Sequence, residues 1–272
     1  MLIAQISDTH IKAAGKLAYR RVDTAQKLQR CIEHLRQLDP APDLVVITGD
    51  LVDLGHPDEY RRLRQLLAPL SQPIVAIPGN HDERDAMRAA FSGDGYLPAS
   101  GFLQFAIDDA YPLRIIGLDT LIPGQGCGAL CAKRLAWLET TLARRPSRPT
   151  LILMHHPPFA TGIGHMDALG LSGADDFERL VARHGQVEAI LCGHLHRPIQ
   201  TTVGQRRAMT APSPAHQVTL DLRPSAPSRF SLEPPGYFLH RWDGRRLVTH
   251  HALIDAYEGP YPFFDADGRL ID

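Results

Sequence analysis

The chain has 272 residues and a net charge of −1, and 44% of its residues are apolar and 22% charged. These values fit a globular protein with a sizeable core, and they lack the basic excess typical of nucleic-acid binding. The N-terminus has no basic segment, and no apolar run approaches the ~20 residues of a membrane span. Four scattered cysteines argue against a disulfide framework. We therefore expect a cytoplasmic protein without membrane contact.

Apolar runs that stop abruptly before a polar residue recur along the chain and predict buried parallel strands. The clearest run leads from residues 44–47 through Thr48 and Gly49 to Asp50. Amphipathic helices are predicted between these runs, so we expect an α/β fold. The predicted strands cover residues 2–7, 44–47, 74–77, 102–107, 113–118, 150–154 and 187–192. The predicted helices begin after Asp23, begin at Pro57, and cover residues 83–91, 133–144 and 175–184.

The pattern changes after residue 197. Short strands are predicted over 199–203, 207–210 and 216–220, followed by a linker over 223–229. Asp243-Gly244 lies between two apolar runs, which predicts a β-hairpin formed by residues 237–242 and 245–253. We therefore predict a catalytic core over residues 1–197. Residues 198–272 would supply cap, hairpin and tail elements that complete the sandwich and an oligomer interface.

Donors typical of metal sites stand where five predicted strands end. In an extended segment, residues two apart point the same way, so D-T-H and H-L-H can each share one ion. The set contains no thiolate, which disfavours a structural zinc site and suits Mn, Fe, Zn or Co with open positions. Seven donors fit two divalent ions bridged by Asp50. Two-ion sites of this kind usually catalyse in-line displacement at a phosphorus atom. The seven are Asp8, His10, Asp50, Asn80, His155, His194 and His196.

The motifs D-x-H, G-D-x-x-D, G-N-H-D, H-H-P-P and G-H-x-H occur in this order over residues 8 to 196. In all five the chain resembles the calcineurin-like metallophosphoesterases. The segments LIAQISDTH, IPGNHD, MHHPPF and AHQV look most similar to the bacterial branch of glycerophosphodiesterases and class III cyclic-nucleotide phosphodiesterases. That resemblance implies a four-layer α/β/β/α sandwich, with a small cap and dimerisation segments from the C-terminal part.

The resemblance also implies roles for individual residues. His81 would lie near the leaving group, where a histidine can act as general acid, and His216 would lie at the mouth of the pocket. Leu195 stands where some relatives have a polar residue, which affects substrate contacts rather than metal binding. One ion would be held by Asp8, His10, Asp50 and His196, and the other by Asp50, Asn80, His155 and His194.

Structural interpretations are open at several of these positions. Asp53 and Asp82 either take part in the site or only orient neighbours and cap helices. His156 follows a predicted ligand directly and is expected to point away from the ions. A single strand-end histidine is more often structural than a ligand, but five donor clusters together favour ligation. The other histidines are assigned to the surface or to packing: His34, His165, His184, His240, His250 and His251.

We therefore expect a binuclear-metal-dependent phosphodiesterase that hydrolyses small soluble diesters of the glycerophosphodiester type through metal-activated hydroxide. The first alternative is a 3′,5′-cyclic-nucleotide (cAMP) phosphodiesterase. A phosphomonoesterase, a nuclease and a non-catalytic scaffold rank lower, because no ligand is missing and no basic excess exists. An aromatic tail is expected either to fold back on the core or to form a homo-oligomer interface, dimeric or larger. It contains Tyr257, Tyr261, Phe263 and Phe264.

Overall fold

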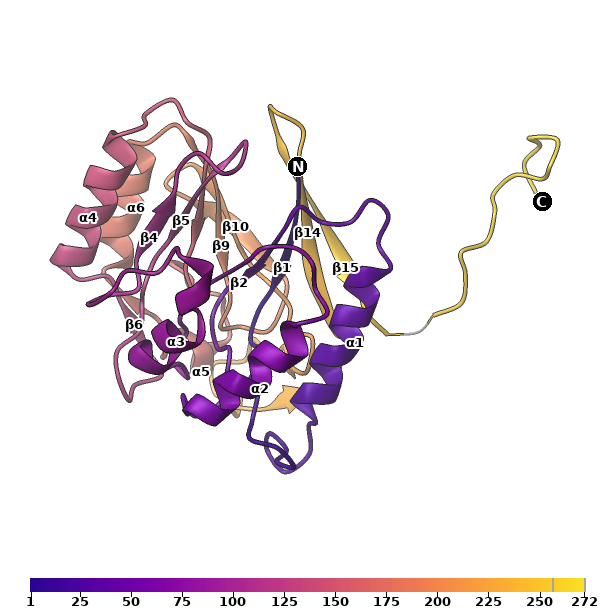
Figure 1. Cartoon of the computed structure of the whole chain (residues 1–272), viewed down its shortest axis with the longest axis horizontal. Helices are drawn as coiled ribbons and strands as arrows, with labels where there is room; N and C mark the ends of the chain where they lie inside the picture. Colours follow the sequence, from indigo (N-terminus) through magenta and orange to yellow (C-terminus); the bar gives the residue numbers. More distant parts are fainter. Residues whose placement is uncertain (256, 272) are drawn as a thin grey trace.

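Two β-sheets lie face to face, and helices cover the outer face of each sheet (Figure 1). The structure is a computed structural model that describes residues 1–255 and 257–271. The five-stranded sheet has the order β15-β14-β1-β2-β3, and the six-stranded sheet has the order β10-β11-β9-β7-β5-β4. The predicted α/β/β/α layers are therefore confirmed. The cap and dimerisation segments remain predictions.

The helices and strands lie close to their predicted positions, and most are shorter by a few residues. The five-stranded sheet contains β1 (Leu2–Ile6), β2 (Leu44–Ile47), β3 (Ile74–Ala76), β14 (Gly236–Trp242) and β15 (Leu247–Leu253). The six-stranded sheet contains β4 (Phe105–Ile107), β5 (Arg114–Gly117), β7 (Thr150–Leu153), β9 (Val187–Cys192), β10 (Ile199–Val203) and β11 (Arg206–Thr210). The helices are α1 (Thr24–Arg36), α2 (Pro57–Leu67), α3 (Arg84–Ala90), α4 (Ala132–Ala143), α5 (Gly164–Asp167) and α6 (Ala174–Ala182).

Strand alternation explains the layers. On β2, Leu44 and Val46 pack between the two sheets, whereas Val45 and Ile47 pack against the helices on the outer face. β7 behaves in the same way, because Leu151 faces the other sheet and Ile152 faces the layer of α4 and α6. Strands that are apolar on both faces must be covered on both faces, and here the second sheet covers one face and the helices cover the other.

Parallel strands carry the chain towards one edge of each sheet. β1, β2 and β3 are parallel neighbours, and so are β5, β7 and β9. The carboxyl ends of parallel strands meet at a common edge, where α/β proteins bind their ligands. The segments that leave these strands are therefore brought together, although they are far apart in the sequence.

The C-terminal part completes both sheets. The predicted hairpin is confirmed, since β14 pairs antiparallel with β15 and also with β1. β11 pairs with β9, and β10 follows it at the sheet edge. The segment predicted over 216–220 is reduced to β12 (Gln217–Val218), which pairs with β13 (Phe230–Ser231). A second small pair joins β6 (Gly128–Ala129) and β8 (Leu171–Ser172). The division at residue 197 remains a prediction.

The aromatic tail lies away from the body of the protein (Figure 1). Its side chains Tyr257, Tyr261, Phe263 and Phe264 are all exposed, so of the two expected placements the tail does not take the one on the core, and the homo-oligomer interface stays a prediction. In the part of the chain that the structure describes, none of the helices has the length and apolar character of a membrane span. All four cysteines are free thiols.

Gly193, directly after β9, allows the two sheets to approach each other. A Cβ atom at this position would lie 2.2 Å from Oγ of Ser7 and 2.5 Å from the carbonyl oxygen of Thr48. The ends of β1 and β2 therefore press against this glycine. Gly185, in the loop before β9, has no heavy atom within 4 Å of the position of an added Cβ.

Gly193→Ala is expected to destabilise the protein by ~1–3 kcal/mol, the usual cost of inserting a methyl group into a packed interior. One of the two obstacles is backbone, so it cannot rotate away. Gly185→Ala is the matched control, because the same change occurs in open space. Thermal unfolding of both variants measures the difference, and an unchanged Tm for Gly193→Ala would show that the sheets do not need this close approach.

Candidate metal centre

The predicted donors converge where the two sheets meet. Asp8 and His10 follow β1, Asp50 follows β2, and Asn80 follows β3 in the five-stranded sheet. The remaining donors come from the six-stranded sheet: His155 follows β7, and His194 and His196 follow β9. The donor atoms of Asp8, Asp50 and His155 all lie within 4.8 Å of one another, as do those of Asp8, His10 and His196.

The first cluster contains His155, Asn80 and Asp50. Nδ1 of His155 donates to the carbonyl oxygen of Thr48 at 2.8 Å, so the hydrogen on this atom is committed to that bond. Nε2 of the same ring lies 3.1 Å from Oδ1 of Asn80 and 3.3 Å from Oδ2 of Asp50. Three acceptor-type atoms face one another in a buried place, which requires a proton or a cation among them.

The second cluster contains Asp8, His10 and His196. Nδ1 of His196 donates to the carbonyl oxygen of His216 at 3.0 Å. Its Nε2 lies 3.1 Å from Nε2 of His10 and 3.5 Å from Oδ1 of Asp8. Nε2 of His10 is also 3.5 Å from Oδ2 of Asp50, the oxygen that faces His155. One carboxylate oxygen is therefore shared by both clusters.

His194 and His156 differ in their hydrogen bonding. Nε2 of His194 is buried and has no hydrogen-bond partner among residues 1–255 and 257–271. Both ring nitrogens of His156 are engaged, Nδ1 with the hydroxyl of Thr120 at 2.8 Å and Nε2 with the carbonyl oxygen of Gly126 at 3.1 Å. His194 therefore has a nitrogen available to a ligand, whereas His156 supports the surrounding loops, although the two rings lie close together.

Backbone strain is concentrated at the same residues. Asp8, His10, Asp50, His194 and His196 have φ values of 56°, 42°, 49°, 72° and 53°. Residues other than glycine seldom adopt this left-handed region, and such strain gathers at functional sites. These five are all predicted ligands. The left-handed turn at each strand end redirects its side chain towards the shared edge.

The protonation of the clusters follows from their burial and charges. Burial opposes protonation of His155, but Asp50 and Asp8 raise its pKa to about 9. Burial together with the charge of His10 lowers the pKa of His196 to about 3. Burial would raise the pKa of Asp50, yet His155 and His81 hold it well below the usual range. Without a cation, the proton of His155 therefore offsets the negative charge of the Asp50 carboxylate.

His81 lies beside the clusters and is held in one orientation. Its Nδ1 donates to the carbonyl oxygen of Asp53 at 2.8 Å, and its backbone N–H donates to Oδ1 of Asp50 at 2.9 Å. The Asp53 carboxylate also pairs with Lys12, and it lies 3.7 Å from Nδ1 of His10. Asp53 thus connects the chain around His81 to a predicted ligand, which favours the orienting interpretation over the capping one.

His216 is buried next to the second cluster, and its predicted place at the mouth of the pocket stays a prediction. Its ring is 4.5 Å from that of His196 and 5.8 Å from that of His10, measured between centroids. Nδ1 is buried and has no hydrogen-bond partner within the described chain. Asp82 has a structural environment instead, because it accepts hydrogen bonds from the Tyr60 hydroxyl and from the backbone N–H groups of Gly79 and Leu51.

Sequence reasoning missed a buried polar connection beneath the clusters. Nε2 of His240 is 3.0 Å from Oε1 of Gln5, and Nε2 of Gln5 donates to the hydroxyl of Thr48 and to the carbonyl oxygen of Cys192. The Thr48 carbonyl in turn orients His155. His240 was assigned to the surface or to packing. A glutamine in the middle of the first apolar run was the signal that could have indicated a polar partner.

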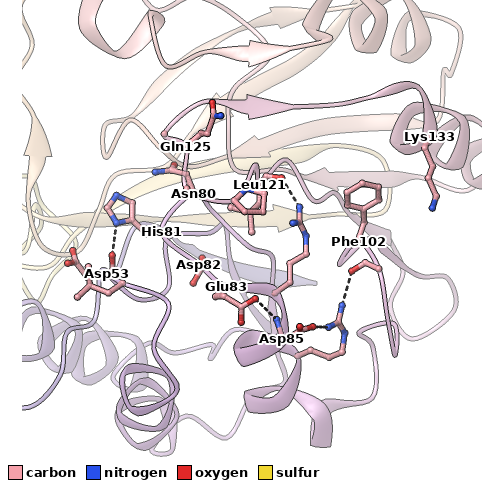
Figure 2. A pocket seen from close by; sticks show the side chains of 17 residues that line it. Asp53, Asn80, His81, Asp82, Glu83, Asp85, Phe102, Leu121, Gln125 and Lys133 are labelled. Carbon is pink, nitrogen blue, oxygen red and sulfur yellow. Dashed lines mark hydrogen bonds and ion pairs between the residues drawn. The ribbon is translucent and has the colours of Figure 1, made fainter.

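A cleft opens from Asn80 and His81 into the surrounding surface (Figure 2). Its volume is about 900 Å³, within the range of small-molecule sites, ~300–1,000 Å³. Phe102 and Lys133 lie at the opposite end from His81 (Figure 2). The metal centre therefore has room beside it for a substrate of metabolite size.

The chain is similar to bacterial phosphodiesterases over nearly its whole length. A probable glycerophosphodiester phosphodiesterase GpdQ of Arcobacter nitrofigilis is 43% identical over 274 aligned residues, and the alignment covers 100% of this chain and 100% of that protein. The 3′,5′-cyclic adenosine monophosphate phosphodiesterase CpdA of Escherichia coli K12 is 33% identical, over 93% of this chain and 90% of CpdA.

A solved structure shares the architecture at much lower identity. The crystal structure of a dimetal phosphatase from Danio rerio has a TM-score of 0.66 and 14% identity, over 94% of this chain and 96% of that one. It supports the fold alone. Residues 1–198 match the family described as calcineurin-like phosphoesterase. With that match and the full-length relatives, the chain belongs to the calcineurin-like metallophosphoesterases, close to the GpdQ and class III cAMP phosphodiesterase branch.

Proposed function

We propose that the chain is a binuclear-metal-dependent phosphodiesterase that hydrolyses small glycerophosphodiesters. The observation that carries the proposal is the shared oxygen of Asp50, 3.3 Å from Nε2 of His155 and 3.5 Å from Nε2 of His10. A bridging carboxylate between two donor sets is the arrangement that a two-ion site needs. The full-length similarity to the A. nitrofigilis relative named for glycerophosphodiesters supports the substrate class.

The donors fit two divalent cations. Backbone carbonyls accept hydrogen bonds from Nδ1 of His155 and of His196, so each ring turns Nε2 towards the clusters, and a hydrogen bond of this kind usually orients a metal-bound histidine. At the second cluster, one ion would be held by Asp8, His10, Asp50 and His196. At the first cluster, the other ion would be held by Asp50, Asn80, His155 and His194. The absence of thiolates suits Mn, Fe, Zn or Co.

The residues around the donors supply the remaining needs of the reaction. Two divalent cations, when bound, neutralise the charge of a phosphodiester and lower the pKa of water towards 7. His81 donates its Nδ1 hydrogen to a carbonyl, so the proton that its imidazolium form can pass to the departing alkoxide is the one on Nε2. His216 lies close enough to the second cluster to contact a bound phosphoryl group.

A cyclic-nucleotide phosphodiesterase is the second candidate. The CpdA relatives named for cyclic AMP align over more than nine tenths of the chain, as the GpdQ relatives do. The glycerophosphodiester class ranks first because the relative with 43% identity carries that name, compared with 33% for CpdA of E. coli K12.

Cellular setting and assembly complete the proposal. Four free thiols suit a reducing compartment, so we place the enzyme in the cytoplasm. The exposed tail presents Tyr261 and Phe263 at 71% and 78% exposure, an apolar surface that another copy of the chain would cover. A monomeric sedimentation profile at micromolar concentration would remove this part of the proposal.

Asp50→Ala is expected to abolish hydrolysis of bis-p-nitrophenyl phosphate by the Mn- or Co-loaded protein, because it removes a donor from both sets. Asn80→Ala removes a neutral donor from one set, so it should lower the affinity for only one of the two ions, by more than about tenfold. Asp58→Ala, an exposed carboxylate on α2, is the control. Metal content and turnover are measured together. Full binding of two ions by Asp50→Ala would contradict the shared-ligand assignment.

The substrate assignment predicts an order of specificities. Glycerophosphoethanolamine should be hydrolysed with a higher kcat/KM than cyclic AMP, and both should exceed p-nitrophenyl phosphate, a monoester. Steady-state rates on the three compounds with the same enzyme preparation decide between the candidates. A higher kcat/KM for cyclic AMP would replace the first candidate with the second.

Metal affinity should increase as the pH rises from 6 to 8. His155 has a pKa raised to about 9, so at these pH values a binding cation displaces its proton, and this competition weakens as protons become scarcer. Asp8, whose burial raises its pKa to about 6, acts in the same direction. Calorimetric titration in buffers of different ionisation enthalpy measures the released protons. Equal affinity at pH 6 and pH 8 would refute this competition.

A further inference from the structure

The cleft beside the metal centre has a second end with a different chemistry. Asn80 and His81 line one end, and Phe102 and Lys133 line the other (Figure 2). Arg84 also lines the cleft, with its guanidinium 5.3 Å from the centroid of the Phe102 ring. A diester whose phosphoryl group is held by the donor clusters would extend one of its two alcohols along this cleft. The groups at the far end therefore decide which alcohol is accepted.

Arg84 is held rigidly at this end. Its Nε and Nη2 donate to the two oxygens of Asp119 at 2.7 and 2.8 Å, and Nη2 also donates to the carbonyl oxygen of Leu121. Asp119 is completely buried and accepts two further backbone N–H groups. Nη1 of Arg84 has no partner within the described residues, so the fixed guanidinium of this cleft-lining residue keeps one unused donor group.

Two more cations gather around Phe102. The guanidinium of Arg134 lies over the ring at 4.0 Å, that of Arg84 at 5.3 Å and the ammonium of Lys133 at 5.8 Å from its centroid. Burial and the charge of Arg84 lower the pKa of Arg134 despite the nearby Asp119. The buried carboxylate in this group is Asp119, which pairs with Arg84, and the cleft is also lined by the carboxylates of Glu83 and Asp85. We call Arg84, Phe102 and Lys133 the cationic shelf.

The carboxylates of the same cleft are already engaged. Glu83 accepts the backbone N–H groups of Asp85 and Ala86, and Asp85 pairs with Arg88. Towards the metal centre, Asp82 accepts the three hydrogen bonds described above, and Asp53 pairs with Lys12. By contrast, Lys133 lies in the first turn of α4, where the helix dipole adds positive potential, and its ammonium has no anionic partner in the described chain.

We infer that the cationic shelf binds an anionic substituent, such as a carboxylate, on the alcohol of the diester. Arg84 provides the fixed donor group and Lys133 the mobile charge, and the Phe102 ring holds the cations in place. The inference rests on the proposed phosphodiesterase function and narrows its substrate class to diesters whose alcohol carries a negative group.

A trimethylammonium headgroup fits this surface poorly. Such groups bind to open aromatic faces, but Phe102 already has a guanidinium 4.0 Å from its centroid and two more cations within 6 Å. The positive charge of the trimethylammonium group would also be repelled by Arg84 and Lys133. Glycerophosphocholine should therefore be a poor substrate compared with diesters that end in a carboxylate.

Glycerophosphoserine and glycerophosphoethanolamine provide the test, because they differ by one carboxylate. The ratio of their kcat/KM values should exceed about ten in the unaltered enzyme, the effect of one charge-assisted hydrogen bond. Lys133→Ala should lower the ratio towards one, and Lys133→Glu should bring it below one. Calorimetric binding of O-phospho-L-serine and phosphoethanolamine, which differ by the same carboxylate, gives a second readout without turnover.

Arg144→Ala is the matched control, because it removes an exposed cation at the opposite end of α4. It should leave the ratio unchanged. A ratio near one in the unaltered enzyme, or one that Lys133→Glu does not move, would overturn the shelf while leaving the phosphodiesterase intact. If neither diester is hydrolysed by the metal-loaded protein, the proposed function fails and this inference fails with it.

Discussion

Acceptor atoms face acceptor atoms at the edge where the two sheets meet, and the rest of the structure is arranged around this contact. Oδ2 of Asp50 lies between the Nε2 atoms of His155 and His10, and Oδ1 of Asp8 faces Nε2 of His196. Buried charges of this kind are costly unless protons or cations lie among them. The close packing of the two sheets holds the clusters together, and left-handed backbone turns aim the side chains inwards.

The orientation of the imidazoles depends on backbone atoms of the opposite sheet or a neighbouring loop. The Thr48 carbonyl, directly after β2 of the five-stranded sheet, fixes His155, which follows β7 of the six-stranded sheet. Gln5 joins Thr48 to Cys192 and reaches His240 on β14, so one buried polar connection spans both sheets. A satisfied buried network of this type rigidifies its surroundings. The C-terminal hairpin thereby contributes to the support of a histidine that lies more than eighty residues earlier in the chain.

The cleft separates two tasks in space. Donors for cations lie at the end formed by Asn80 and His81, and the cationic shelf lies at the end formed by Phe102 and Lys133. The cations would engage the phosphoryl group that all diesters share, whereas the shelf meets the alcohol in which they differ. Arg84 can act as a recognition group because Asp119 uses only part of its donor set.

The sequence by itself indicated an α/β fold with buried strands and named the polar residues at the strand ends, and its family resemblance supplied the four layers. Apolar runs without alternation can only be strands buried on both faces, and motifs placed at their ends specify what reaches the common edge. Element ends were less predictable, because hydrogen-bond pairing rather than hydrophobicity decides where a strand stops, as in β12. Histidine roles depended on neighbours from distant strands. His156 and His155 are adjacent in sequence, yet only the fold shows that Thr120 and Gly126 occupy both nitrogens of His156.

Tertiary structure alone decided three further features. His240 belongs to a buried network because β14 pairs with β1, a contact between residues more than two hundred positions apart. The cationic shelf combines a residue of α3, one of α4 and a loop aromatic, which no local pattern connects. The aromatic tail was compatible with packing on the core or with an oligomer interface, and in the folded chain it lies exposed. Local sequence specifies strands and ligand types, but only the packing of distant segments decides which polar groups meet and which remain without partners.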